Sequence, residues 1–112
     1  MAEKRFLSFL GASSEDRMRC IFETRSGKVI RIKVVQYETL IHDKWIPVVR
    51  YDTAHGFYHR DVYLFSGRKH LKQVIASASI EEALTFAIQD IRKNWQEYKT
   101  TFLSKENGHA KN

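Results

Sequence analysis

Titratable side chains are concentrated in one short segment, residues 50–61, which holds two histidines, two aspartates and two arginines. Histidine exchanges protons near neutral pH, and a neighbouring aspartate can fix its tautomer or hold its positive charge. The arginine guanidinium matches phosphate oxygens bidentately. The segment therefore predicts acid–base chemistry on a phosphate ester, and the catalytic candidates are His55, His59, Asp52, Asp61 and Arg50.

The reaction that these residue types suggest is metal-independent cleavage of RNA, in which a general base activates the 2′-hydroxyl and a general acid protonates the leaving oxygen. The two histidines would share those roles, Arg50 or Arg60 would stabilise the phosphate charge, and Asp52 or Asp61 would orient a histidine. Two alternatives stay open. The segment is a polar hairpin loop in which Asp52 caps the turn, or the histidines bind a metal with either aspartate, although the spacing matches no strong metal signature. The leading interpretation uses neither a metal nor another cofactor.

Basic residues form a second feature, because the chain carries 19 Lys and Arg against 13 Asp and Glu, a net charge of +6. Many of them fall on two expected hairpins that contain the sequence Ser-Gly. Positive charge with exposed aromatic rings suits phosphate contact and base stacking. The alternative is an ordinary solvated sheet face. The nucleic-acid-binding candidates are Arg31, Lys33, Arg60, Arg68, Lys69, Tyr51 and Tyr63.

The elements that position these residues are mostly strands, because apolar and polar residues alternate with a period of two. This pattern predicts strands over residues 17–23, 29–39, 45–51, 58–65 and 68–76. Turns are expected at Ser26-Gly27, His42-Asp43 and Ser66-Gly67. Residues 11–16 are expected to form a loop after a short N-terminal segment. Pro47 lacks an N–H donor, so its strand should lie at an edge or be irregular there.

Alternation along each strand also predicts which side chains share a face. We expect Ile30, Ile32 and Val34 on one face, with Arg31 and Lys33 on the other. On the strand over 58–65, the open face should carry His59, Asp61 and Tyr63, and the core face should carry Arg60, Val62 and Leu64. Tyr37, Tyr51 and Tyr63 are expected among the basic residues of the uncovered face.

A long C-terminal helix is predicted from Ser79 onward. Ser79 and Glu82 have the spacing of a capping box, and apolar residues continue at steps of three and four from Ile80 to Phe102. At ~1.5 Å per residue such a helix crosses a small sheet completely. The predicted fold is therefore α+β, a four- to five-stranded antiparallel meander with this helix packed on one sheet face. Residues 1–103 form the domain and residues 104–112 a flexible tail.

Composition excludes several classes of protein. Apolar residues make up 43% and charged residues 29% of the chain, which is ordinary for a globular protein and too apolar for a disordered one. A single cysteine excludes an intramolecular disulfide and a cysteine-rich zinc site. No apolar run approaches the ~20 residues of a membrane helix, and no secretory signal is evident. We expect a cytoplasmic protein without membrane contact.

The run from Arg50 to Gly56, followed by His59 and Asp61, has the pattern Arg-Tyr-Asp-x-Ala-His-Gly. It resembles a widespread group of small prokaryotic proteins of uncharacterised function. More distantly, it is similar to the TumE-like toxins of toxin–antitoxin modules, in which a strand ending in aspartate leads into a histidine-rich stretch. The resemblance implies a compact β-sheet domain with a helix that works on or near nucleic acid, with an antitoxin as a protein partner.

The sequence thus leads to a nucleic-acid-directed protein, in its sharpest form a toxin-type endoribonuclease acting on RNA. A non-catalytic nucleic-acid-binding module stays open beside it. So does a protein-interaction regulator of a toxin–antitoxin or phage-defence system. Such a regulator would use an apolar patch near Trp45 or along the late helix, and that helix could also form a homodimer contact.

Overall fold

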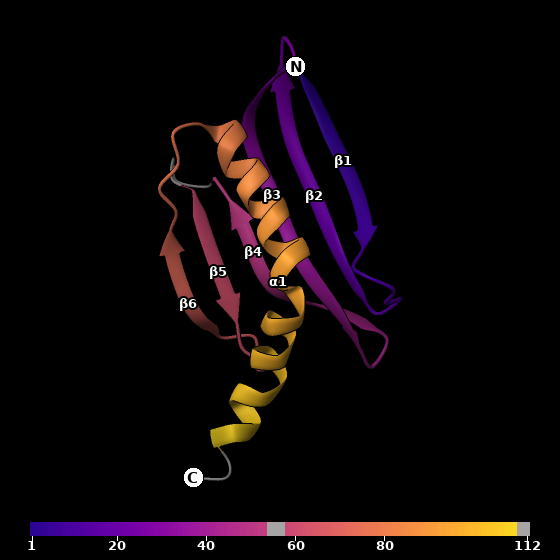
Figure 1. The fold of residues 1–112 in the computed structure, drawn as a ribbon. Helices are drawn as coiled ribbons and strands as arrows, with labels where there is room; N and C mark the ends of the chain where they lie inside the picture. The colour runs from indigo at the N-terminus through magenta and orange to yellow at the C-terminus, as the bar shows by residue number, and fades with distance from the viewer. Residues whose placement is uncertain (54–57, 110–112) are drawn as a thin grey trace.

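A six-stranded antiparallel sheet and one long helix make up the fold (Figure 1). The computed structural model describes residues 1–53 and 58–109, and for residues 70 and 105–109 it describes the backbone alone. The strands lie in the order β1-β2-β3-β4-β5-β6, so each is paired with its neighbour in the chain. The elements are β1 (Ala2–Phe9), β2 (Asp16–Arg25), β3 (Lys28–Ile41), β4 (Lys44–Asp52), β5 (His59–Tyr63), β6 (Lys69–Val74) and α1 (Ile80–His109). The α+β meander with one covering helix is confirmed, whereas the expected count of four to five strands is wrong.

Strand β1 is the element that the sequence pattern missed. It pairs with β2 over its full length, from Ala2 opposite Thr24 to Phe9 opposite Arg17. Nearly all of its residues are exposed, because β1 is an edge strand that α1 does not cover. An edge strand with both faces exposed needs no period-two apolar pattern, and consecutive charges at residues 3–5 remove one.

The hairpin turns follow the predicted chemistry. Ser26 and Gly27 have φ angles of 51° and 78°, and His42 and Asp43 have φ angles of 51° and 64°. Two consecutive residues with positive φ are typical of the turn whose twist matches an antiparallel pair. Both two-residue turns are therefore confirmed, and they fix the β2–β3 and β3–β4 pairings.

Pro47 lies in β4, which is an internal strand between β3 and β5. Opposite it, the β3–β4 register shifts between Tyr37 and Glu38, where Glu38 faces Pro47 and Tyr37 faces Val49. The shift accommodates the missing N–H donor. Of the two expectations for Pro47, the irregularity is confirmed and the edge position is not.

Strand β3 corrects the expected face assignment. Its register with β2 shifts between Ile21 and Phe22, so that Val34 faces Ile21 while Ile32 faces Phe22. Ile32 packs in the core under α1, whereas Val34 lies on the opposite sheet face, and Ile30 is 41% exposed. A bulge reverses the alternation of side chains beyond it, which strict periodicity cannot foresee.

Helix α1 begins as predicted, with the Ser79 hydroxyl oxygen accepting the backbone N–H of Glu82 at 3.1 Å. Its predicted apolar face packs against the sheet, with Ala87, Ile91 and Phe102 almost fully buried. The sequence prediction places residues 104–109 in the tail, whereas the helix continues through them to His109. No helix within the described ranges is long and apolar enough to cross a membrane.

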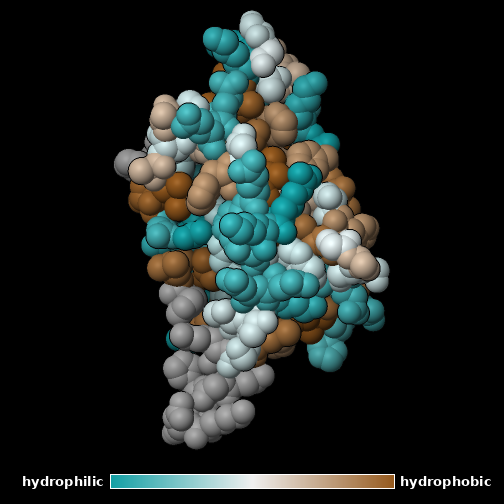
Figure 2. Space-filling model, in the orientation of Figure 1, coloured by the Kyte–Doolittle hydropathy of each residue, from teal (hydrophilic) through white to brown (hydrophobic). Residues whose placement is uncertain are grey.

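The core lies between α1 and the middle of the sheet. The helix packs mainly against β3 and β4, and the largest fully buried side chains include Tyr37, Met18 and Val35. Figure 2, viewed from the helix side, shows a polar stripe along α1 with apolar side chains on either side of it. On the same side of the sheet, Phe6 of β1 lies opposite core residue Cys20 and Leu71 of β6 lies opposite core residue Val62. Phe6 and Leu71 are 36% and 43% exposed.

A polar cluster around Asp90 ties α1 to β4 and β5. The Asp90 carboxylate accepts hydrogen bonds from Tyr51, from Tyr98 at 2.6 Å and from Asn94 at 2.8 Å, and Arg60 Nη1 lies 3.4 Å from it. Burial and the hydrogen bond to Asp90 raise the pKa of Tyr98 from 10.0 to about 12. The cluster therefore keeps the Tyr98 hydroxyl protonated in alkaline solution.

We expect this cluster to make unfolding strongly pH-dependent above pH 10. The stability that protonated Tyr98 contributes is fully present below the unfolded pKa of 10.0 and is lost as pH rises through about 12. Between these two pKa values the folded protein holds one more proton than the unfolded chain. The free energy of unfolding therefore falls by about 1.4 kcal/mol for each unit by which the pH rises. Urea unfolding at several pH values should show a shallower decline in Tyr98→Phe, by the equivalent of about one proton. Identical slopes in the two proteins would contradict the assignment.

Candidate nucleic-acid interface

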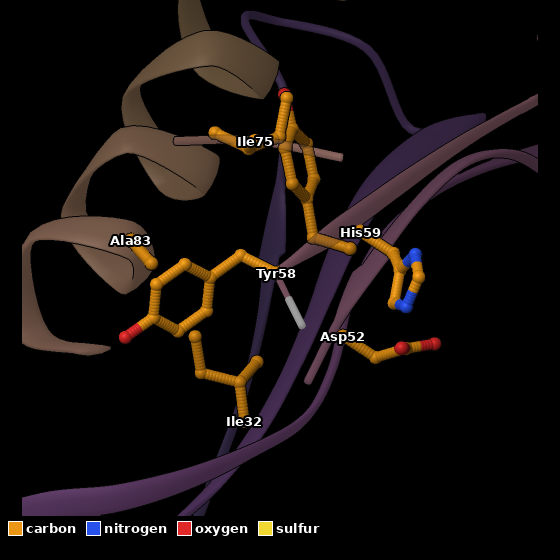
Figure 3. A pocket seen from close by; sticks show the side chains of 7 residues that line it. Ile32, Asp52, Tyr58, His59, Ile75 and Ala83 are labelled. Atoms are coloured by element: carbon orange, nitrogen blue, oxygen red, sulfur yellow. The ribbon is translucent and has the colours of Figure 1, made fainter. Parts of the chain in front are cut away.

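Four of the five catalytic candidates lie together on the sheet face opposite α1, which we call the uncovered face. Asp52 is directly opposite His59, and Arg50 is directly opposite Asp61 on the β4–β5 ladder. Directly opposed residues of an antiparallel pair share a face. Figure 3 shows the Asp52 and His59 side chains pointing away from Tyr58 and the helix. The fifth candidate, His55, lies outside the described residues.

His59 and Asp61 are on the expected face but are almost closed to solvent, whereas the Arg50 side chain is 37% exposed. His59 is 8% exposed and Asp61 is 6% exposed. Arg50 Nε bonds to Asp52 Oδ2 at 3.1 Å, and Lys69 Nζ lies 3.3 Å from Asp61 Oδ2. The cavity that His59 and Asp52 help to line has a volume of about 10 Å³, close to the smallest space that holds one water. It is too small to hold a nucleotide.

The nucleic-acid-binding candidates divide between the two faces. Arg31 and Lys33 lie on the uncovered face, paired with Glu23 and Glu3, and Tyr63 and Lys69 share that face. Arg68 lies in the exposed turn between β5 and β6.

Tyr51 and Arg60 lie on the helix side instead, and the structure does not bring them to the basic face. Tyr51 is 4% exposed within the core. Tyr37 is fully buried there as well. The expectation that Tyr37, Tyr51 and Tyr63 line one face therefore holds only for Tyr63.

A polar network that the sequence analysis missed occupies the centre of the uncovered face. Glu38, 4% exposed, accepts Arg17 Nε at 2.8 Å and Arg19 Nε at 3.1 Å on its two oxygens. Gln36 Nε2 also donates to Glu38 at 2.5 Å, and Arg50 Nη1 donates to Gln36 at 3.5 Å. The alternation of Arg17 and Arg19 with the apolar Met18 predicts that both arginines share one sheet face. No sequence pattern predicts that their partner is Glu38, which lies 21 residues from Arg17 in the chain.

An aromatic group borders this network. The Arg17 guanidinium carbon lies 3.8 Å from the centre of the Trp45 ring, and the Phe9 ring centre is 6.2 Å from that of Trp45.

On the other side of the face, burial and the Asp61 carboxylate raise the pKa of Tyr63, while Lys69 and Arg50 lower it. The charges of the candidate site therefore influence the Tyr63 hydroxyl.

The arginines of the uncovered face share one bonding arrangement. Four of them donate an Nε–H hydrogen bond to a carboxylate of the same face, in the pairs Arg5–Glu3, Arg17–Glu38, Arg19–Glu38 and Arg50–Asp52. Arg31 forms an ion pair with Glu23, with Nε 2.8 Å from the carboxylate. Among the described residues, the terminal amino groups of these arginines make a single side-chain hydrogen bond, from Arg50 to Gln36. The carboxylates thus bind the guanidinium groups through Nε, and most of the terminal N–H groups remain available to a ligand.

Cations outnumber carboxylates on the uncovered face. Its ion pairs contain the carboxylates of Glu3, Glu23, Glu38, Asp52 and Asp61. Its cations are the five arginines of these pairs together with Lys33, Lys69 and Lys72. No group of three or more His, Cys, Asp or Glu side chains suited to a metal ion occurs in residues 1–53 and 58–109. The face therefore offers cationic donors and rings, which suit a phosphate-containing ligand.

Comparison with family models matches residues 1–108 to a domain of unknown function, DUF7718. Comparisons with curated proteins and with solved structures found no similar protein.

Proposed function

The chain belongs to the DUF7718 family, and from the geometry of its uncovered face we propose that it binds single-stranded nucleic acid there, with RNA as the expected ligand. The observation that carries this proposal is the shared orientation of Arg17, Arg19 and Arg50, whose Nε atoms donate hydrogen bonds to carboxylates of the same face. A guanidinium has five N–H donors in a planar fork. Using Nε internally leaves the terminal pair for bidentate contact with a phosphate.

The exposure of the side chains supports contact with a ligand. The Arg19 and Arg50 side chains are 40% and 37% exposed, although each is bonded to a carboxylate. Phosphates would lie along the row that Arg19, Gln36 and Arg50 form across β2, β3 and β4. Bases would stack on Tyr63 or beside Trp45, because aromatic rings accept any base.

The test is the salt dependence of binding. A fluorescent ten-nucleotide RNA should bind the wild-type protein in an anisotropy titration at low salt. For about four phosphate contacts, the logarithm of the association constant should fall with a slope of about −2.8 against the logarithm of salt concentration. Absence of binding at low salt, or binding that salt does not weaken, would refute the proposal.

Ribonuclease activity is a second candidate, favoured by the grouping of Arg50, Asp52, His59 and Asp61 on two opposed strand ends. In this scheme Asp52 would orient His59, and Arg50 would stabilise the phosphate. Because His59 is 8% exposed, catalysis would require the substrate to displace neighbouring side chains. Cleavage of a labelled RNA by wild type and not by His59→Ala would support the activity. Equal cleavage by both, or none by either, would refute it and leave binding as the function.

A further inference from the structure

One carboxylate oxygen of the uncovered face finds no donor within residues 1–53 and 58–109. Asp61 is 6% exposed, and its Oδ1 has no hydrogen-bond partner among the described residues. A buried acceptor without a donor destabilises the folded state, so such groups are rare in folded proteins. The other oxygen, Oδ2, lies 3.3 Å from Lys69 Nζ.

The contact with Lys69 is long for an ion pair, because charge-assisted N–H···O bonds are typically about 2.7–2.9 Å. The Lys69 side chain is also 48% exposed, and lysine is a flexible chain with a mobile charge. A phosphate could therefore draw the ammonium group away from Asp61. Tyr63, two residues along the same strand face, would then offer a ring beside the vacated carboxylate.

We infer that Asp61 reads a guanine base of the bound strand, with both carboxylate oxygens accepting N–H groups from its Watson–Crick edge. This inference rests on the proposed function, since it names the base that the same face would recognise. The displaced Lys69 ammonium contacts a phosphate, and the base stacks on Tyr63. The ligand supplies the donor that the described residues do not offer to Oδ1.

Guanine fits the site for a chemical reason. Its Watson–Crick edge carries two adjacent donors, the ring N1–H and the exocyclic amino group, which match the two oxygens of a carboxylate. Adenine and cytosine each offer one amino group next to an acceptor nitrogen. Uracil offers one N–H between two carbonyl oxygens, which a carboxylate repels. Single-stranded bases expose this edge, whereas duplex pairing hides it.

The experiment compares ten-nucleotide uridine strands that carry guanine, inosine, adenine, cytosine or uracil at one central position, using fluorescence anisotropy. Wild type should bind the guanine strand about tenfold more tightly than the uridine strand. Inosine, which lacks the exocyclic amino group, should lose most of that preference. The preference should appear in DNA strands of the same design as well, since the base edge and not the sugar is read.

Asp61→Asn should reduce the guanine-to-uridine affinity ratio to about one, because an amide offers one acceptor and one donor in place of two acceptors. Asp43→Asn, the same change in the exposed β3–β4 turn, should keep the wild-type ratio. The inosine comparison uses wild-type protein alone, so it stands if Asp61→Asn fails to fold. Equal binding of all strands by wild type, or an unchanged ratio in folded Asp61→Asn, would overturn the inference but not the proposed function. No binding of any strand would overturn both.

Discussion

Asp90→Ala is expected to lower the free energy of unfolding by about 3 kcal/mol, because it removes the carboxylate partner of a buried ion pair. The Asp90 and Arg60 side chains are only 9% and 17% exposed. Without Asp90, the Arg60 guanidinium and the hydroxyls of Tyr51 and Tyr98 lose their common acceptor. Urea unfolding followed by circular dichroism measures the loss as a lower midpoint at constant slope.

The matched control for this change is Glu97→Ala, which removes a carboxylate from an exposed position of the same helix. We expect its effect to be within about 0.5 kcal/mol of wild type, as for most surface substitutions. Asp90→Asn should fall between the two, since its amide oxygen still accepts a hydrogen bond. If Asp90→Ala were no more destabilising than Glu97→Ala, the cluster would not be what fixes α1 on the sheet.

The double substitution Arg19→Gln with Arg50→Gln is expected to weaken RNA binding about 10- to 100-fold at low salt. Glutamine keeps a polar side chain of similar reach but removes the charge that a phosphate would meet. Glu38 would still accept from Arg17 and Gln36, so the network should stay folded. The salt slope should also become shallower by about 1.4, for two lost contacts on a single strand. Anisotropy titrations at three salt concentrations give both quantities.

Arg92→Gln with Lys93→Gln is the control, because it removes the same charge from exposed positions of α1 on the other side of the sheet. Its binding should stay within about twofold of wild type if the uncovered face is the interface. Equal weakening by the two double variants would indicate that net charge, and not this face, accounts for binding. Thermal unfolding of each variant would check that the fold is retained.

Several features of the structure follow from residues that are close together in the chain. The start of α1 at Ser79, its buried stripe and the two-residue turns at Ser26-Gly27 and His42-Asp43 were predictable, because capping and turn chemistry are local. The common face of His59 and Asp61 was also predictable from alternation. Their burial was not, since it depends on side chains that neighbouring strands bring over them.

The network around Glu38 could not be predicted from the sequence, because it joins residues that are far apart in the chain. Arg17 and Glu38 are 21 residues apart and meet because β2 and β3 pair in one register. Trp45 then reaches Arg17 from β4, two strands away. No local pattern contains this register, because it is set by the turn geometry and by the bulges in β3 together.

The sequence by itself thus determined the helix, the antiparallel meander of its central strands and the excess of positive charge. Each of these follows from residues close together in the chain. The tertiary structure alone decided that β1 completes the sheet at its edge. It also decided that Tyr51 and Arg60 turn toward α1 and that Arg17, Arg19 and Arg50 gather on the opposite face. The physical reason is that strand register and bulges assign each side chain to a face, and both depend on pairing between distant segments.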